Sequence, residues 1–142
     1  MNITRYGLAA ATVGNTLYAI GGAKNGGPPL SSVEAYDPTT NTWAAKASMN
    51  LARGALAAAS VGNTLYALGG LDSYDGSLSS VEAYDPATDT WTAKANMNTT
   101  RYRLAAASVG NTLYALGGYN NSIGSLSSVE AITLGYFVHL KN

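Results

Sequence analysis

The stretch Leu17-Tyr18-Ala19-Ile20-Gly21-Gly22 decides the fold, because it returns at a constant spacing of 48 residues. It recurs at residues 65–70 and 113–118, in both cases with Leu in place of Ile20. Outward from this stretch, the same spacing relates Met1, Met49 and Met97; Arg5, Arg53 and Arg101; Glu34, Glu82 and Glu130; and Trp43 and Trp91. A fixed period of this length indicates a repeat architecture. The 142 residues therefore form a single domain of three units, 1–48, 49–96 and 97–142.

Each unit predicts four short strands. In the first unit they cover residues 8–13, 16–20, 32–36 and 42–47. Gly14-Asn15 is a two-residue turn whose residues tolerate positive φ, and the segment from Asp37 to Asn41 has the chemistry of a longer turn. The alanine-rich segment 8–13 favours a helix by propensity, but six residues are too few for a stable one. The sequence thus indicates an all-β protein.

The strands lack a clean alternation of apolar and polar residues. Segments such as Leu17–Ile20 are apolar on both faces, which is typical of sheets covered on both sides by neighbours. Four-stranded sheets repeated at about 50 residues describe the blades of a β-propeller. The alanines of the first strand suit the position nearest the axis, where the blades converge. Helical solenoids are disfavoured, since no unit contains a long periodic run.

The complete pattern resembles the Kelch motif: four hydrophobic residues, a double glycine, then Tyr36 and Trp43 at fixed spacing. The resemblance implies three four-stranded antiparallel Kelch blades. The third unit departs from it, because Val129-Glu130-Ala131 is followed by an atypical tail, residues 132–142, instead of Tyr-Asp-Pro and a Trp. We expect Leu134-Gly135 to turn the chain into a shortened substitute outer strand at residues 136–140.

Three blades make an open arc, whereas Kelch propellers typically have about five to seven blades. The apolar faces of the first and third blades would then be bare, which is a liability in a soluble monomer. We therefore expect a homodimer in which two copies close a six-bladed propeller. The alternative is that the chain is a fragment of a longer propeller.

The units differ mainly in two places, and both lie at the same end of an up-and-down blade. One follows the repeated arginine, and the other follows the double glycine. Variable loops on a rigid scaffold are the usual place for recognition. In Kelch propellers these positions commonly line the ligand-binding mouth, so the resemblance implies a binding site that contains Tyr6, Tyr102, Arg103, Tyr119, Asn120, Asp72 and Tyr74. The alternative is that the loops vary because nothing constrains them.

Residues that recur identically in every unit favour structural roles. For Arg5 and Glu34 with their equivalents we expect ion pairing or backbone hydrogen bonds between blades. For Trp43 and Trp91 we expect packing within the propeller. Asp72 and Asp75 resemble part of a calcium loop, but the spacing and the distal glutamate are missing, so no metal site is predicted.

The amino-acid composition argues against several classes of function. Eight Lys and Arg balance eight Asp and Glu, so no charged field favours nucleic acid or an anionic membrane. There is no Cys and a single His, which exclude the copper and cysteine-modified-tyrosine chemistry of Kelch-like oxidases. No signal peptide or transmembrane segment is predicted, so the localisation is cytoplasmic by default.

We expect a non-catalytic binding or scaffolding module without a cofactor, recognising a protein segment or small polar ligand. One alternative is a self-assembling propeller building block without a ligand, as the near identity of the units suggests. The other is an enzyme resembling the sugar-acid isomerases on Kelch scaffolds.

Overall fold

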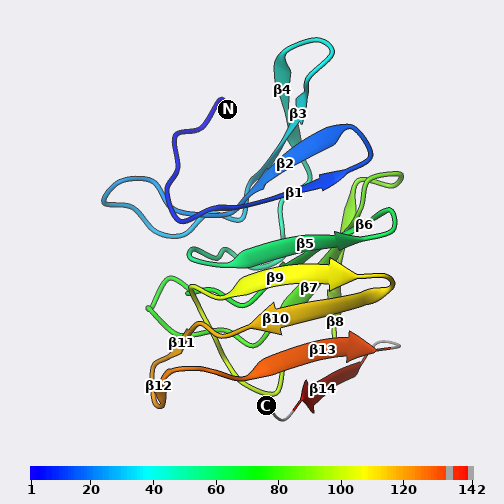
Figure 1. Ribbon diagram of the computed structural model, residues 1–142. Helices are drawn as coiled ribbons and strands as arrows, with labels where there is room; N and C mark the ends of the chain where they lie inside the picture. Colours follow the sequence, from blue (N-terminus) through cyan, green and yellow to red (C-terminus); the bar gives the residue numbers. More distant parts are fainter. Residues whose placement is uncertain (134–135, 141–142) are drawn as a thin grey trace.

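Three four-stranded antiparallel sheets stack side by side along the chain (Figure 1). The computed structural model describes residues 1–133 and 136–140. Each sheet is one blade, as the sequence predicts. Blade 1 contains β1 (Ala9–Val13), β2 (Thr16–Ile20), β3 (Val33–Asp37) and β4 (Thr42–Lys46). Blade 2 contains β5 (Ala57–Val61), β6 (Thr64–Leu68), β7 (Val81–Asp85) and β8 (Thr90–Lys94). Blade 3 contains β9 (Ala105–Val109), β10 (Thr112–Leu116), β13 (Val129–Thr133) and β14 (Tyr136–Leu140), with β11 (Tyr119–Asn120) and β12 (Gly124–Ser125) forming a small hairpin beside it.

The hairpin turn between the first two strands follows from one glycine. Val13 pairs with Thr16 across the turn, and Gly14 takes a φ of 56°. A left-handed φ at the first turn position matches the right-handed twist of the flanking strands, and glycine adopts it without steric cost. The predicted turn is therefore confirmed.

The outer strand of blade 3 is present but is not shortened. β14 pairs with β13 from Thr133 opposite Tyr136 to Val129 opposite Leu140. It has five residues, as β4 and β8 have, so the expectation of a shorter strand was wrong. The sequence Tyr-Phe-Val-His-Leu is rich in β-forming residues over its whole length. The connection between β13 and β14 is shorter than the one between β3 and β4. The predicted turn at Leu134-Gly135 lies outside the described residues.

Apolar side chains fill the two spaces between blades. Between blades 1 and 2 the buried cluster contains Ala9, Tyr18, Ile20, Val33, Ala35, Met49, Leu56, Leu65, Ala67, Tyr84 and Trp91. Between blades 2 and 3 it contains Ala57, Ala59, Leu68, Val81, Met97, Leu104, Leu113 and Ala115. Blade 2 is thus covered on both faces, which explains why its strands do not alternate.

Trp91 holds the outer part of blade 2 against blade 1. Its ring lies 5.1 Å from that of Tyr84, and its Nε1 donates a hydrogen bond to the carbonyl of Ala47 at 2.9 Å. The carboxylate of Asp89 accepts hydrogen bonds from the Ala47 N–H and the Tyr84 hydroxyl. The expected packing role is confirmed for Trp91.

Candidate functional site: the loop face

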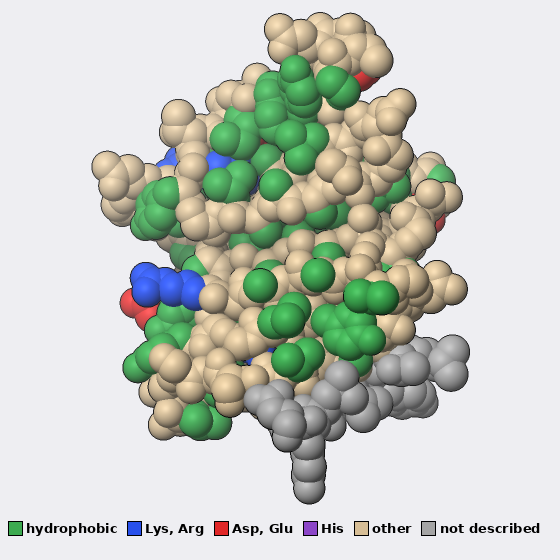
Figure 2. Space-filling model, in the orientation of Figure 1, with side chains coloured by type: hydrophobic (Ala, Val, Ile, Leu, Met, Phe, Trp, Pro, Cys, Tyr) green, Lys and Arg blue, Asp and Glu red, His purple; other side chains and the backbone are tan. Residues whose placement is uncertain are grey.

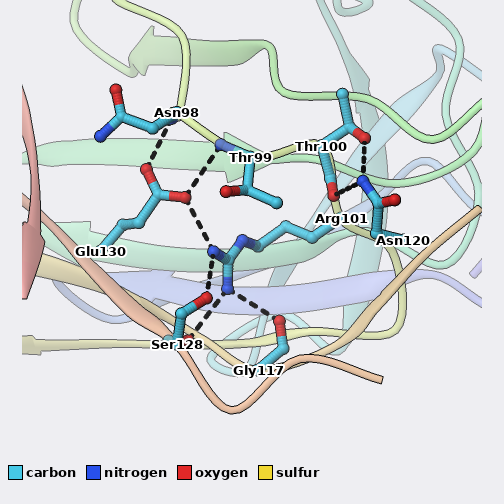
Figure 3. Close-up of polar contacts among 8 residues, drawn as sticks. All are labelled: Asn98, Thr99, Thr100, Arg101, Gly117, Asn120, Ser128 and Glu130. Carbon is cyan, nitrogen blue, oxygen red and sulfur yellow. Dashed lines mark hydrogen bonds and ion pairs between the residues drawn. The ribbon is translucent and has the colours of Figure 1, made fainter. Parts of the chain in front are cut away.

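The loop face is the end of the blades formed by the residues that follow each repeated arginine and each double glycine. A buried ion pair fixes the chain just before it enters this face. Arg101 Nη1 donates to the carbonyls of Gly117 and Ser128, and Nη2 lies 2.7 Å from the carboxylate of Glu130 (Figure 3). That carboxylate also accepts the N–H groups of Asn98 (2.6 Å) and Thr99 (3.1 Å). The pair therefore ties three segments of one blade together.

The same arrangement occurs in each blade. Arg5 lies 2.9 Å from Glu34, and Arg53 lies 2.9 Å from Glu82, with all three arginine side chains fully buried. Burial alone would raise the pKa of Glu34, but hydrogen bonds from the Asn2 N–H and the Arg5 guanidinium outweigh it and hold that pKa below its ordinary value. The expected structural role of the recurring pair is confirmed.

The backbones of Arg53 and Arg101 each connect their blade to the preceding one. The Arg53 N–H donates to the carbonyl of Leu30 at 3.2 Å, and the Arg53 carbonyl accepts the N–H of Gly22 at 3.0 Å. Side chain and backbone of one residue thus hold two adjacent blades. Because the arginine is fixed at both ends, the two residues that follow it are presented at a defined position.

Those two residues form the inner rim of the loop face. The second of the pair adopts a left-handed φ in every blade: 60° at Gly7, 51° at Ala55 and 51° at Arg103. The Ala55 N–H donates to the carbonyl of Gly7, and the Arg103 N–H to the carbonyl of Ala55, both at 2.7 Å. A left-handed φ is unusual for Arg and costs conformational energy, so the surrounding hydrogen bonds must impose it.

A cavity of about 300 Å³ opens between the rim and the loops that follow the double glycines. Its volume is at the lower end for small-ligand sites. Arg103 supplies a cation, Asp72 and Asp75 supply carboxylates, and Tyr6 supplies an aromatic ring that is largely exposed. The remaining lining residues are Gly7, Ala23, Gly27, Pro29, Gly54, Ala55 and Leu71.

Three of the seven residues predicted from sequence line this cavity: Tyr6, Arg103 and Asp72. One Asp72 oxygen already accepts the N–H groups of Tyr74 (2.8 Å) and Gly76 (2.9 Å), which folds its loop back on itself. Tyr74 lies at the tip of that loop and is 93% exposed, away from the cavity lining.

The other three predicted residues lie together in blade 3. The rings of Tyr102 and Tyr119 meet edge to face at 5.5 Å, and the guanidinium of Arg103 lies 5.8 Å from the centre of the Tyr102 ring. Asn120 is buried: its amide donates to the carbonyl and hydroxyl of Thr100, and its oxygen accepts two N–H groups from its own hairpin. The Asn120 side chain therefore shapes the loop face.

Sequence reasoning missed several lining residues. Asp75 attracted notice only as part of an incomplete calcium loop, and Gly7 and Ala55 were not named as site residues although both are in the lining. The difference between blades after the arginine was a signal that could have found Gly7 and Ala55. In the described part of the chain, no group of three His, Cys, Asp or Glu residues is arranged to hold a metal ion. Nor do these residues include a helix long and apolar enough to cross a membrane.

Comparison with known proteins identifies the family of the chain and a solved structure with a similar fold. The family model for the Kelch motif matches residues 4–50, 52–98 and 100–134, so the chain belongs to the Kelch family. The fold is also similar to the "Structure of YjhT", with a TM-score of 0.84 and 14% sequence identity over 96% of this chain. The match covers 52% of that solved chain, so this chain spans about half its length.

Proposed function

We propose that the chain is a non-catalytic binding module that recognises a protein segment or a small polar ligand at the loop face. The observation that carries the proposal is the cavity in which Arg103, Asp72 and Asp75 share one lining with Tyr6. Variable loops on a rigid scaffold, here fixed by the buried arginine–glutamate pairs, suit recognition. Membership of the Kelch family supports the same reading.

The charges in the lining indicate the chemistry of the ligand. A guanidinium binds a carboxylate with paired, charge-assisted hydrogen bonds, and the aspartates favour an ammonium group. Tyr6 offers a ring for apolar or cationic contact. A zwitterionic segment, such as a peptide with neighbouring glutamate and lysine side chains, satisfies all three features.

Calorimetric titration with a capped Glu-Gly-Lys peptide tests the proposal. Arg103→Gly places there the residue that blade 1 has at the equivalent Gly7, so the left-handed backbone is kept while the cation is removed. We expect this variant and Asp72→Asn each to weaken binding about tenfold or more. Lys94→Ala removes an exposed cation from β8, outside the cavity, and should leave the affinity unchanged.

Two outcomes would contradict the proposal. If capped peptides of every charge pattern fail to bind the folded protein, the loop face is not a recognition site for such segments. If the chain turns over a sugar acid and Asp72→Asn abolishes that turnover, the aspartates act as acid–base groups and the module is an enzyme.

A further inference from the structure

The two end faces of the stack carry side chains that are buried wherever a blade has a neighbour. On blade 3, Leu116 is 37% exposed, whereas its equivalents Ile20 and Leu68 are fully buried at the inner junctions. On blade 1, Leu17 and Trp43 are half-buried, whereas Leu65 is fully buried and Trp91 nearly so. Figure 2 shows hydrophobic side chains gathered over β3 and β4 at one end and over β9 and β10 at the other.

Three backbone hydrogen bonds that face the loop end recur at both inner junctions. The second glycine of the pair donates to the arginine carbonyl of the next blade, and the arginine N–H donates back to a leucine carbonyl. The residue two positions after the arginine donates to its equivalent in the preceding blade. Between blades 1 and 2 these bonds are Gly22 to Arg53, Arg53 to Leu30 and Ala55 to Gly7; between blades 2 and 3 they are Gly70 to Arg101, Arg101 to Leu78 and Arg103 to Ala55.

At the two ends of the stack, the backbone groups that would form these three hydrogen bonds have no neighbouring blade to bond to. Blade 3 presents the N–H of Gly118 and the carbonyls of Leu126 and Arg103, none of which has a hydrogen-bond partner among the described residues. Blade 1 presents the backbone N–H and carbonyl of Arg5 and the N–H of Gly7, which are likewise unpaired there. The Arg5 side chain is fully buried, so the exposed part of this residue is its backbone. Each donor at one end has its acceptor at the other.

We propose that a second copy of this chain covers both faces, blade 3 of each copy joining blade 1 of its partner. The partner is identified by complementarity, because the unpaired donors and acceptors at the end of blade 3 match those that blade 1 presents. Two such junctions related by a twofold axis close a ring of six blades. This chain spans 52% of a solved chain with the same fold, so two copies would together match the length of that chain. This assembly does not depend on the ligand proposed for the loop face.

One glycine distinguishes this interface from any other. A Cβ at Gly21 would come within 2.5 Å of the Arg53 carbonyl of the next blade. At the equivalent Gly117 a Cβ would meet only the Leu126 carbonyl, at 3.2 Å, because no blade follows. Gly110 has the same φ of 57° as Gly117 but lies in open space. Alanine therefore strains the backbone similarly at Gly110 and at Gly117, whereas only Gly117→Ala obstructs a partner.

Sedimentation equilibrium on the complete chain tests the proposal. We expect the wild type at twice the chain mass of 14.6 kDa. Gly110→Ala should remain a dimer, and Gly117→Ala should raise the dissociation constant about tenfold or more. A monomeric wild type at high concentration, or an assembly larger than two chains, would overturn the proposal. So would a Gly117→Ala dimer as tight as that of Gly110→Ala, since the interface would then lie elsewhere.

A second pair of variants serves if Gly117→Ala does not fold. Leu116→Glu puts a charge on the end face of blade 3 at a side chain already partly exposed, so folding of the single chain should persist. Ile123→Glu alters an exposed apolar residue of the loop between β11 and β12. The first variant should dissociate the dimer and the second should not. Equal dimer affinity in both variants would contradict the assignment of the face.

Discussion

Replacing Arg53 with methionine tests what the buried ion pairs contribute to the fold. The guanidinium is fully buried and donates hydrogen bonds to the carbonyls of Gly69 and Ser80 and to the carboxylate of Glu82. Methionine fills a similar space but provides neither the charge nor the donors. It leaves Glu82 charged and buried, with only the N–H groups of Asn50 and Leu51 as partners.

Removing one member of a buried ion pair costs about 3–5 kcal/mol, because the other charge remains desolvated. A domain of this size has a free energy of unfolding of about 5–15 kcal/mol, so the loss is a large fraction of the total. For a urea dependence of about 1–3 kcal/mol/M, the unfolding midpoint should fall by about 1 M or more. Urea denaturation followed by tryptophan fluorescence measures the shift, and Trp43 and Trp91 supply the signal.

Two further variants make this prediction specific. Lys94→Met removes an exposed cation and should change the free energy of unfolding by no more than about 0.5 kcal/mol. The double variant Arg53→Met, Glu82→Leu removes both charges, yet the four backbone groups that the pair bonded lose their partners. Stability should therefore recover only in part. A loss below about 1 kcal/mol in Arg53→Met, or full recovery in the double variant, would refute this reasoning.

Three other perturbations have expected outcomes. Trp91→Phe should destabilise the protein by more than Trp43→Phe in thermal unfolding, because the Trp91 ring donates a hydrogen bond to the preceding blade and the Trp43 ring donates none among the described residues; equal effects would contradict the role of that bond. Hydrogen bonds from the Ala47 N–H and the Tyr84 hydroxyl lower the pKa of Asp89, so its contribution to stability is present above the unfolded pKa of about 3.9 and is lost as the pH falls through the folded pKa. Asp89→Asn should therefore make the loss of stability below about pH 4 shallower, as acid titration of the unfolding free energy would show, and an unchanged acid profile would remove Asp89 from the account. Gly14→Ala should cost about 1–2 kcal/mol for its left-handed φ alone. Gly70→Ala should cost about 1–3 kcal/mol more, because its Cβ would lie 2.7 Å from the Gly54 carbonyl; similar urea midpoints for the two would contradict the close approach.

The sequence predicts most of the fold because its repeats remove ambiguity. Three copies of one pattern locate each strand to within about a residue, and the observed β1 and β3 each begin one residue later than expected. The substitute strand β14 was also found from its β-forming composition. Its length was misjudged because nothing in a single atypical tail indicates where the missing residues fall.

The candidate site was predicted in outline only. Differences between blades select residues at one end of the blades, and the structure places three of them around one cavity. These differences do not reveal which side chains line the cavity. Tyr74 is at a loop tip, Asn120 is buried by its own hairpin, and Asp75 lies in the cavity lining. The left-handed backbone at Arg103 could not be read either, because it results from hydrogen bonds between blades.

Mapping a bound peptide onto the backbone amides tests the central functional claim most directly. In a ¹⁵N-labelled sample titrated with the capped Glu-Gly-Lys peptide, we expect the largest shifts at Tyr6, Ala55, Asp72 and Arg103, which line the cavity. The amide of Asn15, in the turn at the far end of β1 and β2, should not move. Shifts centred on that opposite end, or no shifts at all at millimolar peptide, would contradict the claim that the loop face is a recognition site.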